Sequence, residues 1–305
     1  MRSHLRSLAL AGATLLALGA VPDVTAQPRA ADDPPAPLLV TEAWLARRLP
    51  QPDLVVVHVA FDKAEYDAGH IPGARFIPFA GYAVTSADSL RTELPPRDSL
   101  ARVFGRAGIS NTSRVIIVGA PIPATRFLLT LAATGLDARA SVLDGGIEAW
   151  REAMRPMTTE VPAVGVTVPT LTDATRVLAT AAEVRGIVGS GGAQLLDARL
   201  PEFFTGVANN GFPRAGRIQG AANVPFNTLT RELGRLRDPK TIDRLLAAAG
   251  AAKGTPVVTY CHVGQQASLL WFAARLAGRE ARVYDGSFQE WSRLTDAPVS
   301  TGPAR

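Results

Sequence analysis

The sequence predicts an α/β protein made of two copies of one domain, each with a mainly parallel sheet flanked by helices. Two observations predict this fold. Short apolar runs rich in β-branched residues alternate with helical patterns, which is the order that parallel βαβ units produce. The same series of segments also occurs twice along the chain of 305 residues, a length that suits two domains.

In the first copy, an apolar strand is expected at Leu54–His58, followed by the turn-rich segment from Gly69 to Pro78. A second strand is expected at Arg114–Val118, followed by a loop and an apolar helix. Asp144 and Gly145 then form a turn that leads to Trp150, which is expected in the core.

The second copy repeats this order. Its segment from Gly216 to Pro225 corresponds to Gly69–Pro78, and the segment from Asp285 to Trp291 corresponds to Asp144–Trp150. The periodicity predicts strands near 194–197, 256–260 and 282–284, and helices near 180–188, 240–249, 267–277 and 287–294.

These segments give domain boundaries of 36–158 for the first copy and 174–303 for the second. Between them, residues 159–173 form the expected linker, because Val, Pro and Thr alternate there without a helical period.

Residues 1–26 have the pattern of a secretory signal peptide. Arg2 and Arg6 precede a short apolar stretch, and small residues lead up to Ala26, where we expect cleavage. An uncleaved membrane anchor is the alternative. The mature protein is expected to be periplasmic or secreted, with no stable membrane association after cleavage.

Composition excludes some classes of function. The net charge is +5, but basic residues are scattered and only 6% of residues are aromatic, so no nucleic-acid partner is expected. The positive charge favours small anions instead. No His, Cys or carboxylate cluster has metal-ligand spacing, and the sequence calls for neither a metal nor another cofactor.

Cys261 is the only cysteine, which rules out an intramolecular disulfide. It follows the apolar strand at 256–260 and precedes a helix, so its sulfur is expected at the carboxyl end of a buried strand. Backbone N–H groups at a helix start favour a thiolate. The alternative is an inert, buried cysteine.

The residues after Cys261 are the expected substrate-binding loop. Backbone N–H groups of His262, Val263 and the following residues can form a cradle for an anion. Gly264 permits close approach of the loop to the sulfur, and Gln265 and Gln266 can donate further hydrogen bonds. A histidine with an ordinary pKa of about 6.5 is mostly neutral at pH 7, so the amides matter more than His262.

The chain resembles tandem-domain rhodaneses, the thiosulfate and 3-mercaptopyruvate sulfurtransferase family. Four segments carry the resemblance: Leu196–Arg199, Gly216–Pro225, Tyr260–Gln266 and Tyr284–Trp291, with their counterparts in the first copy. The resemblance implies two rhodanese-like domains and a Cys261 that accepts a sulfane sulfur as a persulfide.

The two copies are chemically unequal. Gly119 stands where Cys261 stands in the second copy, and His58 stands where Asp197 does. Pro121 and Pro123 interrupt the corresponding loop and cannot donate backbone hydrogen bonds. The first domain is therefore expected to be non-catalytic. Either it covers one side of the active cleft or its role is purely structural.

Asp197, Arg199 and Arg217 are further candidates for substrate binding. Asp197 and Arg199 match an Asp-x-Arg element of the family, but a structural salt bridge explains them equally well. Arg217 replaces the family's usual histidine, which the first copy keeps as His70, a residue expected to pack in a turn. Asp144 and Asp285 are expected near helix N-caps.

The resemblance implies transfer of sulfur from thiosulfate to cyanide or a thiol, with a protein thiol among the acceptors considered. Mercaptopyruvate is the alternative donor, since His262-Val263 matches neither the residues that follow the cysteine in thiosulfate enzymes of the animal type nor those in mercaptopyruvate enzymes. In addition, Phe203 stands where animal enzymes use an arginine. A non-catalytic persulfide carrier or thiol sensor is a third reading. Ala267 occupies the place of the phosphate-binding arginine of related phosphatases, which disfavours that activity.

Overall fold

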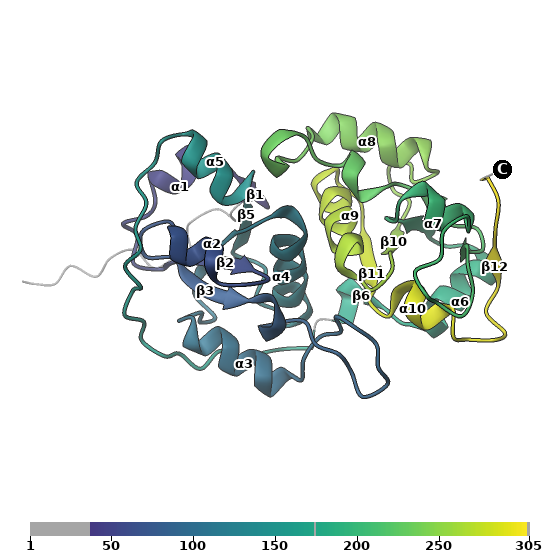
Figure 1. Cartoon of the computed structure of the whole chain (residues 1–305), viewed down its shortest axis with the longest axis horizontal. Coiled ribbons are helices and arrows are strands. Elements are labelled where there is room, and N and C mark those ends of the chain that lie inside the picture. The colour runs from purple at the N-terminus through teal and green to yellow at the C-terminus, as the bar shows by residue number, and fades with distance from the viewer. Residues whose placement is uncertain (1–36, 174, 304–305) are drawn as a thin grey trace, which may run out of the picture. The chain divides into compact units, whose positions relative to one another are not determined.

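The computed structural model describes residues 37–173 and 175–303, and within them two five-stranded sheets of parallel strands (Figure 1). The strand order is β1-β5-β4-β2-β3 in the first sheet and β6-β11-β10-β7-β9 in the second. Position by position, these orders are the same. The predicted α/β class and the duplication are therefore confirmed, while the predicted signal peptide lies outside the described residues.

The first domain alternates strands and helices. Its elements are β1 (Leu39–Val40), α1 (Glu42–Ala46), β2 (Leu54–Ala60), α2 (Ala64–Ala68), β3 (Arg75–Pro78), η1 (Phe79–Gly81), α3 (Arg97–Arg106), β4 (Arg114–Val118), α4 (Pro121–Ala133), β5 (Ala140–Leu143) and α5 (Gly146–Glu152).

Alternate residues of this sheet face two different helix layers. Val55, Val57 and Val59 of β2 pack with α3 and α4, whereas Leu54 and Val56 pack with α1, α2 and α5. Since successive side chains of a strand point to opposite faces, a continuous apolar run such as β2 fits a sheet that is covered on both sides.

The second domain follows the same plan. Its elements are η2 (Thr175–Val177), β6 (Leu178–Ala179), α6 (Ala181–Ser190), β7 (Gln194–Asp197), α7 (Pro201–Thr205), β8 (Arg217–Ile218), β9 (Ala222–Asn223), η3 (Phe226–Thr228), η4 (Glu232–Gly234), α8 (Pro239–Ala248), β10 (Val257–Tyr260), α9 (Gln265–Leu276), β11 (Ala281–Tyr284), α10 (Ser287–Trp291) and β12 (Val299–Ser300).

The predicted strands and helices of this copy are confirmed, with ends that shift by a few residues. Local sequence explains several helix starts. Thr180 and Glu183 form a capping box at α6, and Asp238 caps α8, which has Pro239 in its first turn. One face of the sheet packs with α8 and α9, and the other with α6, α7 and α10.

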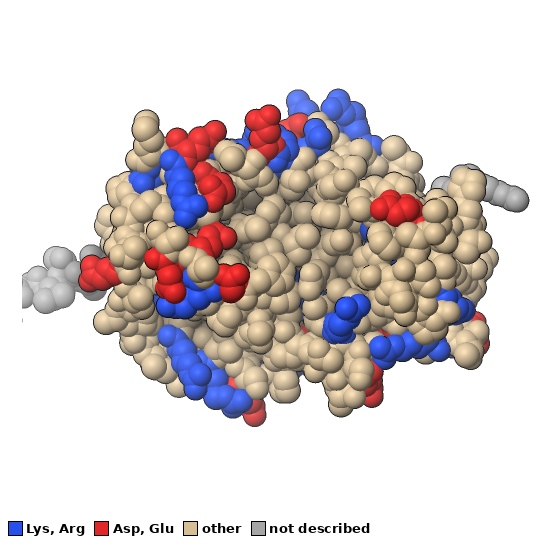
Figure 2. Space-filling view, viewed as in Figure 1, with Lys and Arg blue, Asp and Glu red and all other residues tan. Residues whose placement is uncertain are grey.

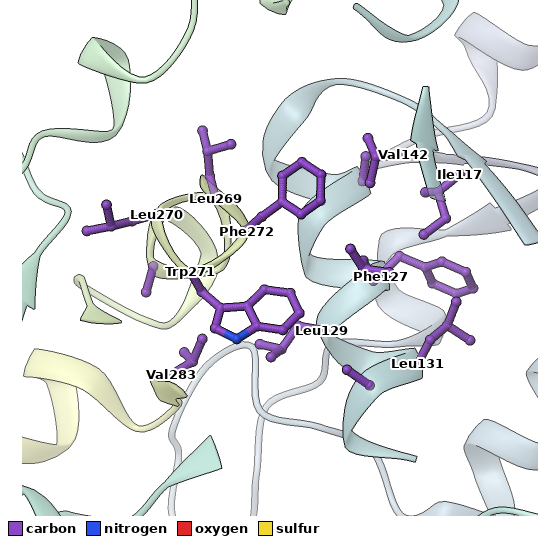
Figure 3. Close-up of a cluster of buried hydrophobic side chains, with 14 of the residues drawn as sticks. Ile117, Phe127, Leu129, Leu131, Val142, Leu269, Leu270, Trp271, Phe272 and Val283 are labelled. Carbon is purple, nitrogen blue, oxygen red and sulfur yellow. The ribbon is translucent and has the colours of Figure 1, made fainter. Parts of the chain in front are cut away.

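The helix layers α4 and α9 join the two domains in a single hydrophobic cluster (Figure 3). Leu129 and Leu131 come from α4, and Trp271 and Phe272 come from α9; all four are buried. Figure 3 shows Trp271 and Phe272 pointing from α9 toward α4. Because a hydrophobic interface of this kind resists domain motion, α9 is held from both sides.

The expected linker contains no helix or strand and runs against the first domain. Thr167 donates its backbone N–H to Gly105 at 3.0 Å, and Thr172 donates to Thr134 at the same distance. Within the described residues, no helix is long and apolar enough to cross a membrane.

Candidate active site

Cys261 is the first residue after β10, which lies between β11 and β7 in the second sheet. Its side chain is 1% exposed and carries a free thiol. Its backbone N–H donates to Ser287 Oγ at 3.2 Å, and its carbonyl accepts from Phe288 N at 3.0 Å. The predicted position at the carboxyl end of a buried strand is confirmed.

Four backbone N–H groups are directed at the Cys261 sulfur. They belong to Val263, Gly264, Gln266 and Ala267, in the loop and first turn of α9. Burial raises the pKa of the Cys261 thiol above its ordinary value, and these hydrogen bonds oppose that rise. The amide cradle is therefore present as expected. However, burial outweighs it in the free protein.

Gly264 has a backbone conformation that a side chain would strain. Its φ is +88°, and a Cβ there would lie 2.7 Å from Asp285 Oδ1 and 3.1 Å from Arg126 Nη1. The loop can pack against the Asp285–Arg126 pair in this way because Gly264 carries no side chain.

Ser287 is a site residue that sequence reasoning missed. It is fully buried, adopts a φ of +53°, and donates its hydroxyl to Tyr284 O at 2.8 Å while accepting from Cys261 N. The equivalent residue in the first copy is Gly146, with a φ of +54°. A residue other than glycine is uncommon in this conformation, and aligning the two copies shows that serine replaces glycine here.

The first domain contributes Arg126 to the site. This fully buried residue of α4 forms a two-pronged ion pair with Asp285, with Nη2 3.0 Å from Asp285 Oδ2, and also donates to the carbonyl of Thr92. The hydroxyl of Thr92 in turn donates to the Val263 carbonyl. A chain of polar contacts thus links the first domain to the loop after Cys261.

The segment 84–93 of the first domain reaches the second domain near α10 (Figure 1). Gln289 exchanges two hydrogen bonds of 2.9 Å with the backbone of Arg91, and Gln289 N donates to His262 O at 3.0 Å. Beside this contact, burial and the neighbouring Asp285 raise the pKa of Glu93 to about 8. Contact between the first domain and the active loop is therefore confirmed.

His262 lies among aromatic rings at the start of the loop. Its ring meets Phe203 edge-on at 4.6 Å between centroids and Phe212 at 5.8 Å. Burial, together with the positive charges of Arg199 and Arg91, lowers the pKa of His262 to about 4. The expected neutral state of His262 at pH 7 is thus favoured, and Phe203 lies at the site.

Two buried atoms of the loop, His262 Nδ1 and Gln266 Oε1, have no hydrogen-bond partner.

Asp197 and Arg199 form a buried salt bridge instead of an open anion site. Arg199 Nε lies 2.9 Å from Asp197 Oδ1, and Nη2 donates to Asp197 Oδ2 at 2.5 Å and to Gly216 O at 2.8 Å. The guanidinium also stacks 4.2 Å above the ring of Phe288. The structure favours the structural interpretation of this pair, since Nε and Nη2 of Arg199 are engaged within the fold.

Arg217 was considered as an anion contact or as a solvated or structural residue, and its contacts favour the structural interpretation. Its guanidinium donates to Gly302 O at 2.7 Å and Pro303 O at 3.3 Å, and it stacks 4.4 Å over Phe204. Arg217 thereby fastens the C-terminal segment, where β8 pairs with β12. Its counterpart His70 stacks on Tyr66 with centroids 3.6 Å apart, as a packing residue should.

Asp144 and Asp285 do follow strands in turns, but neither side chain caps a helix. Asp285 pairs with Arg126 of the first domain, and Asp144 accepts the backbone N–H of Leu236 from the second at 2.8 Å. Each copy therefore uses this aspartate to hold the other copy. The predicted place of both aspartates in a turn near a helix N-cap is confirmed, since Gly145 and Gly286 are the N-cap residues. Their partners in the other copy were not predicted, because a sequence pattern shows only local partners.

The corresponding place in the first domain has no room for a nucleophile. A Cβ on Gly119 would lie 2.3 Å from Val59 O, and a Cβ on Gly146 would lie 2.4 Å from Gly119 O. His58 pairs with Val118 as Asp197 pairs with Tyr260, so the predicted alignment of the copies is confirmed. α4 begins directly at Pro121.

No group of His, Cys, Asp or Glu side chains in ranges 37–173 and 175–303 is arranged to hold a metal ion. Around the Cys261 thiol, the site has four backbone N–H groups and the buried guanidinium groups of Arg126 and Arg199, which Asp285 and Asp197 neutralise.

Comparison with known proteins agrees with this geometry. The model of the Rhodanese-like domain matches residues 41–153 and again 180–294. Two copies of one parallel sheet, with a single cysteine in an amide-lined loop, define a tandem rhodanese-like protein. The chain belongs to the rhodanese family.

Named relatives place it among sulfurtransferases. It is 31% identical to a thiosulfate sulfurtransferase of Corynebacterium glutamicum over 87% of this chain and 90% of that protein. It is 29% identical to the sulfur carrier protein TtuD of Thermus thermophilus, over 87% and 97%. A solved structure, the anaerobic ergothioneine biosynthesis enzyme of Chlorobium limicola, shares the fold with a TM-score of 0.77 at 23% identity, over 88% of this chain and 71% of that one.

Proposed function

We propose that the protein transfers a sulfane sulfur from thiosulfate to cyanide or a thiol through a persulfide on Cys261. The observation that carries this proposal is the set of four N–H groups around the sulfur of the sole cysteine. Such a cradle stabilises negative charge on Cys261 and on a sulfur bound to it.

In the first half of the reaction, Cys261 loses its proton to solvent, and the thiolate attacks the outer sulfur of thiosulfate. A new S–S bond forms, the S–S bond of the donor breaks, and sulfite leaves with the electron pair. In the second half, the acceptor attacks the outer sulfur of the persulfide, and the Cys261 thiolate leaves. Both halves are nucleophilic displacements that need no cofactor or external oxidant.

The donor is an anion, and Arg91 is the cation best placed to attract it. This residue is exposed, and its positive charge is felt by His262, beside Cys261. Arg126 and Arg199 are closer to the sulfur, but Asp285 and Asp197 neutralise them. Long-range attraction by Arg91 supports thiosulfate and leaves mercaptopyruvate, which is also anionic, as the alternative donor.

A second candidate function is that of a persulfide carrier that hands its sulfur to a protein thiol. The relative named as a sulfur carrier, which matches over nearly its whole length, supports this alternative. The same Cys261 persulfide serves both functions, so they differ only in the acceptor.

We also propose that the protein acts after export, in the periplasm or outside the cell, once the segment up to Ala26 has been removed. Edman sequencing of the protein isolated from the producing cell tests this, with a mature N-terminus near residue 27 expected. A retained Met1 would contradict it.

Formation of thiocyanate from cyanide tests the enzyme function, with thiosulfate and mercaptopyruvate compared as donors. Wild-type protein should turn over thiosulfate faster, and Cys261→Ser should abolish turnover with both. Folded wild-type protein that turns over neither donor would overturn the enzyme proposal. Faster turnover of mercaptopyruvate would replace the donor.

The role of Arg91 has a separate readout. Arg91→Gln should raise the KM for thiosulfate several-fold and reduce its dependence on salt, with little change in kcat. Arg47→Gln, another exposed arginine of the first domain, is the matched control and should leave both constants unchanged.

A further inference from the structure

A cavity of about 470 Å³ lies in the first domain, between the edge strand β3, helix α3 and the linker. Phe76, Val103 and Val164 contribute apolar walls, and exposed Val161 stands at its border. Its volume is within the range of small-molecule sites. It would hold roughly fifteen waters at about 30 Å³ each, which is more space than an inorganic ion needs.

Three cations line this cavity: Lys63, Arg75 and Arg106. None of the described residues lining it carries a carboxylate. Lys63 is paired with Asp67 at 2.7 Å, whereas Arg106 makes no ion pair within ranges 37–173 and 175–303. Figure 2 shows basic side chains gathered over α3, which contributes Arg97, Arg102 and Arg106.

Arg75 is the unusual member of this group. Its Nε and Nη1 atoms are buried and have no hydrogen-bond partner. Leaving donors of a charged group unpaired in a buried place costs free energy, and a folded protein pairs nearly all such groups. A carboxylate bound in the cavity would offset this cost through its charge, and it would pair with the part of the half-buried guanidinium that lines the cavity.

We propose that this cavity binds a small organic anion with an apolar body, its acidic group on Arg75 and Arg106 and its apolar body against Phe76, Val103 and Val164. This site is separate from Cys261, since none of the residues lining it belongs to the Cys261 loop or to its contacts described above. It gives the non-catalytic domain a binding role of its own and does not depend on the proposed sulfur transfer.

Calorimetric titration of the full chain with octanoate tests the proposal, with 1-octanol as the uncharged match. Octanoate should bind at least tenfold more tightly than 1-octanol. Arg75→Gln and Arg106→Gln should each weaken octanoate binding by about fivefold to tenfold. Arg47→Gln, exposed in the same domain and outside the cavity, and Cys261→Ser should bind like the wild type.

Arg106 is exposed, so its variant remains informative if Arg75→Gln does not fold. Equal binding of octanoate and 1-octanol would overturn the proposal, as would unchanged binding in a folded Arg75→Gln or Arg106→Gln variant. Vesicles of phosphatidylglycerol distinguish a lipid surface from a free anion. Sedimentation of the protein with vesicles, without octanoate binding, would also overturn it.

Discussion

Cys261 gains its chemical setting from backbone groups, and Ser287 holds that backbone in place. Ser287 accepts the N–H of Cys261 and donates to Tyr284 O, at a positive φ that costs free energy in any residue but glycine. A strained, fully buried hydroxyl next to the nucleophile indicates that the hydrogen bond to Cys261 is worth more than the strain.

Substitution of Ser287 separates these two effects. Ser287→Ala should lower the free energy of unfolding by about 1–3 kcal/mol, because it leaves the Cys261 N–H unpaired and keeps the strain. Ser287→Gly relieves the strain and should be more stable than the Ala variant by about 1 kcal/mol. Both should turn over more slowly. Urea unfolding measures the order, and an Ala variant as stable as the wild type would refute it.

The ionisation of His262 gives a second test. Because its pKa in the folded protein is lowered to about 4, below the ordinary value near 6.5, protonation favours unfolding. The stability linked to His262 is therefore complete above about pH 6.5 and declines as pH falls toward 4.

Ring NMR signals of His262, assigned by their loss in His262→Gln, should show a titration midpoint near pH 4. Between about pH 5.5 and 8, kcat/KM should show no ionisation from this residue. A midpoint near 6.5 would mean that the ring is solvated and the aromatic surroundings of Phe203 and Phe212 do not shield it.

The sequence predicted the site only in part, for a physical reason. Cys261, the loop to Ala267 and Gly264 are contiguous, and the strand-loop-helix pattern locates them together. Ser287, Arg91 and Arg126 reach the site through tertiary contacts that a local pattern does not contain. The partners of Arg217, which are carbonyls of the C-terminal segment, are likewise absent from the local pattern.

Among the elements, the ends of β4 and β10 show how one fold supports a copy with a cysteine site and a copy without one. β10 ends at a cysteine with an open amide loop before α9. β4 ends at Gly119, whose backbone is packed against Val59, and α4 starts almost at once with Pro121. The strands themselves were predicted accurately because long buried apolar runs leave little choice of structure.

The packing at Gly119 predicts the effect of a side chain there. Gly119→Ala places a Cβ 2.3 Å from Val59 O and should destabilise the protein by about 1–3 kcal/mol or more. Gly165→Ala is the matched control, since a Cβ there meets nothing within 4 Å. Thermal unfolding compares the two. Equal melting temperatures would show that β2 and β4 are spaced more loosely than described.

Viewed as a whole, the protein has one hydrophobic cluster that runs from the first domain through α4 and α9 into the second. At the border of this cluster, equivalent aspartates of the two copies make polar contacts between the domains. Asp285 pairs with Arg126, and Asp144 accepts the backbone N–H of Leu236. The domains were predicted from the repeat. The polar contacts between the domains were not predicted, because the aspartate of each copy binds a partner in the other copy.

Arg126 tests this fastening. Arg126→Leu leaves Asp285 buried without its partner and should lower the free energy of unfolding by about 3–5 kcal/mol. Asp285→Asn should lower it as well, and the double variant should lose clearly less than the sum of the two. Additive losses would contradict the interdomain ion pair. Slower turnover in Arg126→Leu is also expected, because Thr92, whose hydroxyl donates to Val263 O, loses its hydrogen bond from Arg126.

Sulfur loading of Cys261 is decided by the intact mass of the protein before and after incubation with thiosulfate. Wild-type protein should gain the mass of one sulfur atom and lose it again when cyanide is added. Cys261→Ser should gain nothing. A wild-type mass that stays unchanged with thiosulfate would contradict a persulfide formed from this donor, and an equal gain in Cys261→Ser would contradict Cys261 as its site.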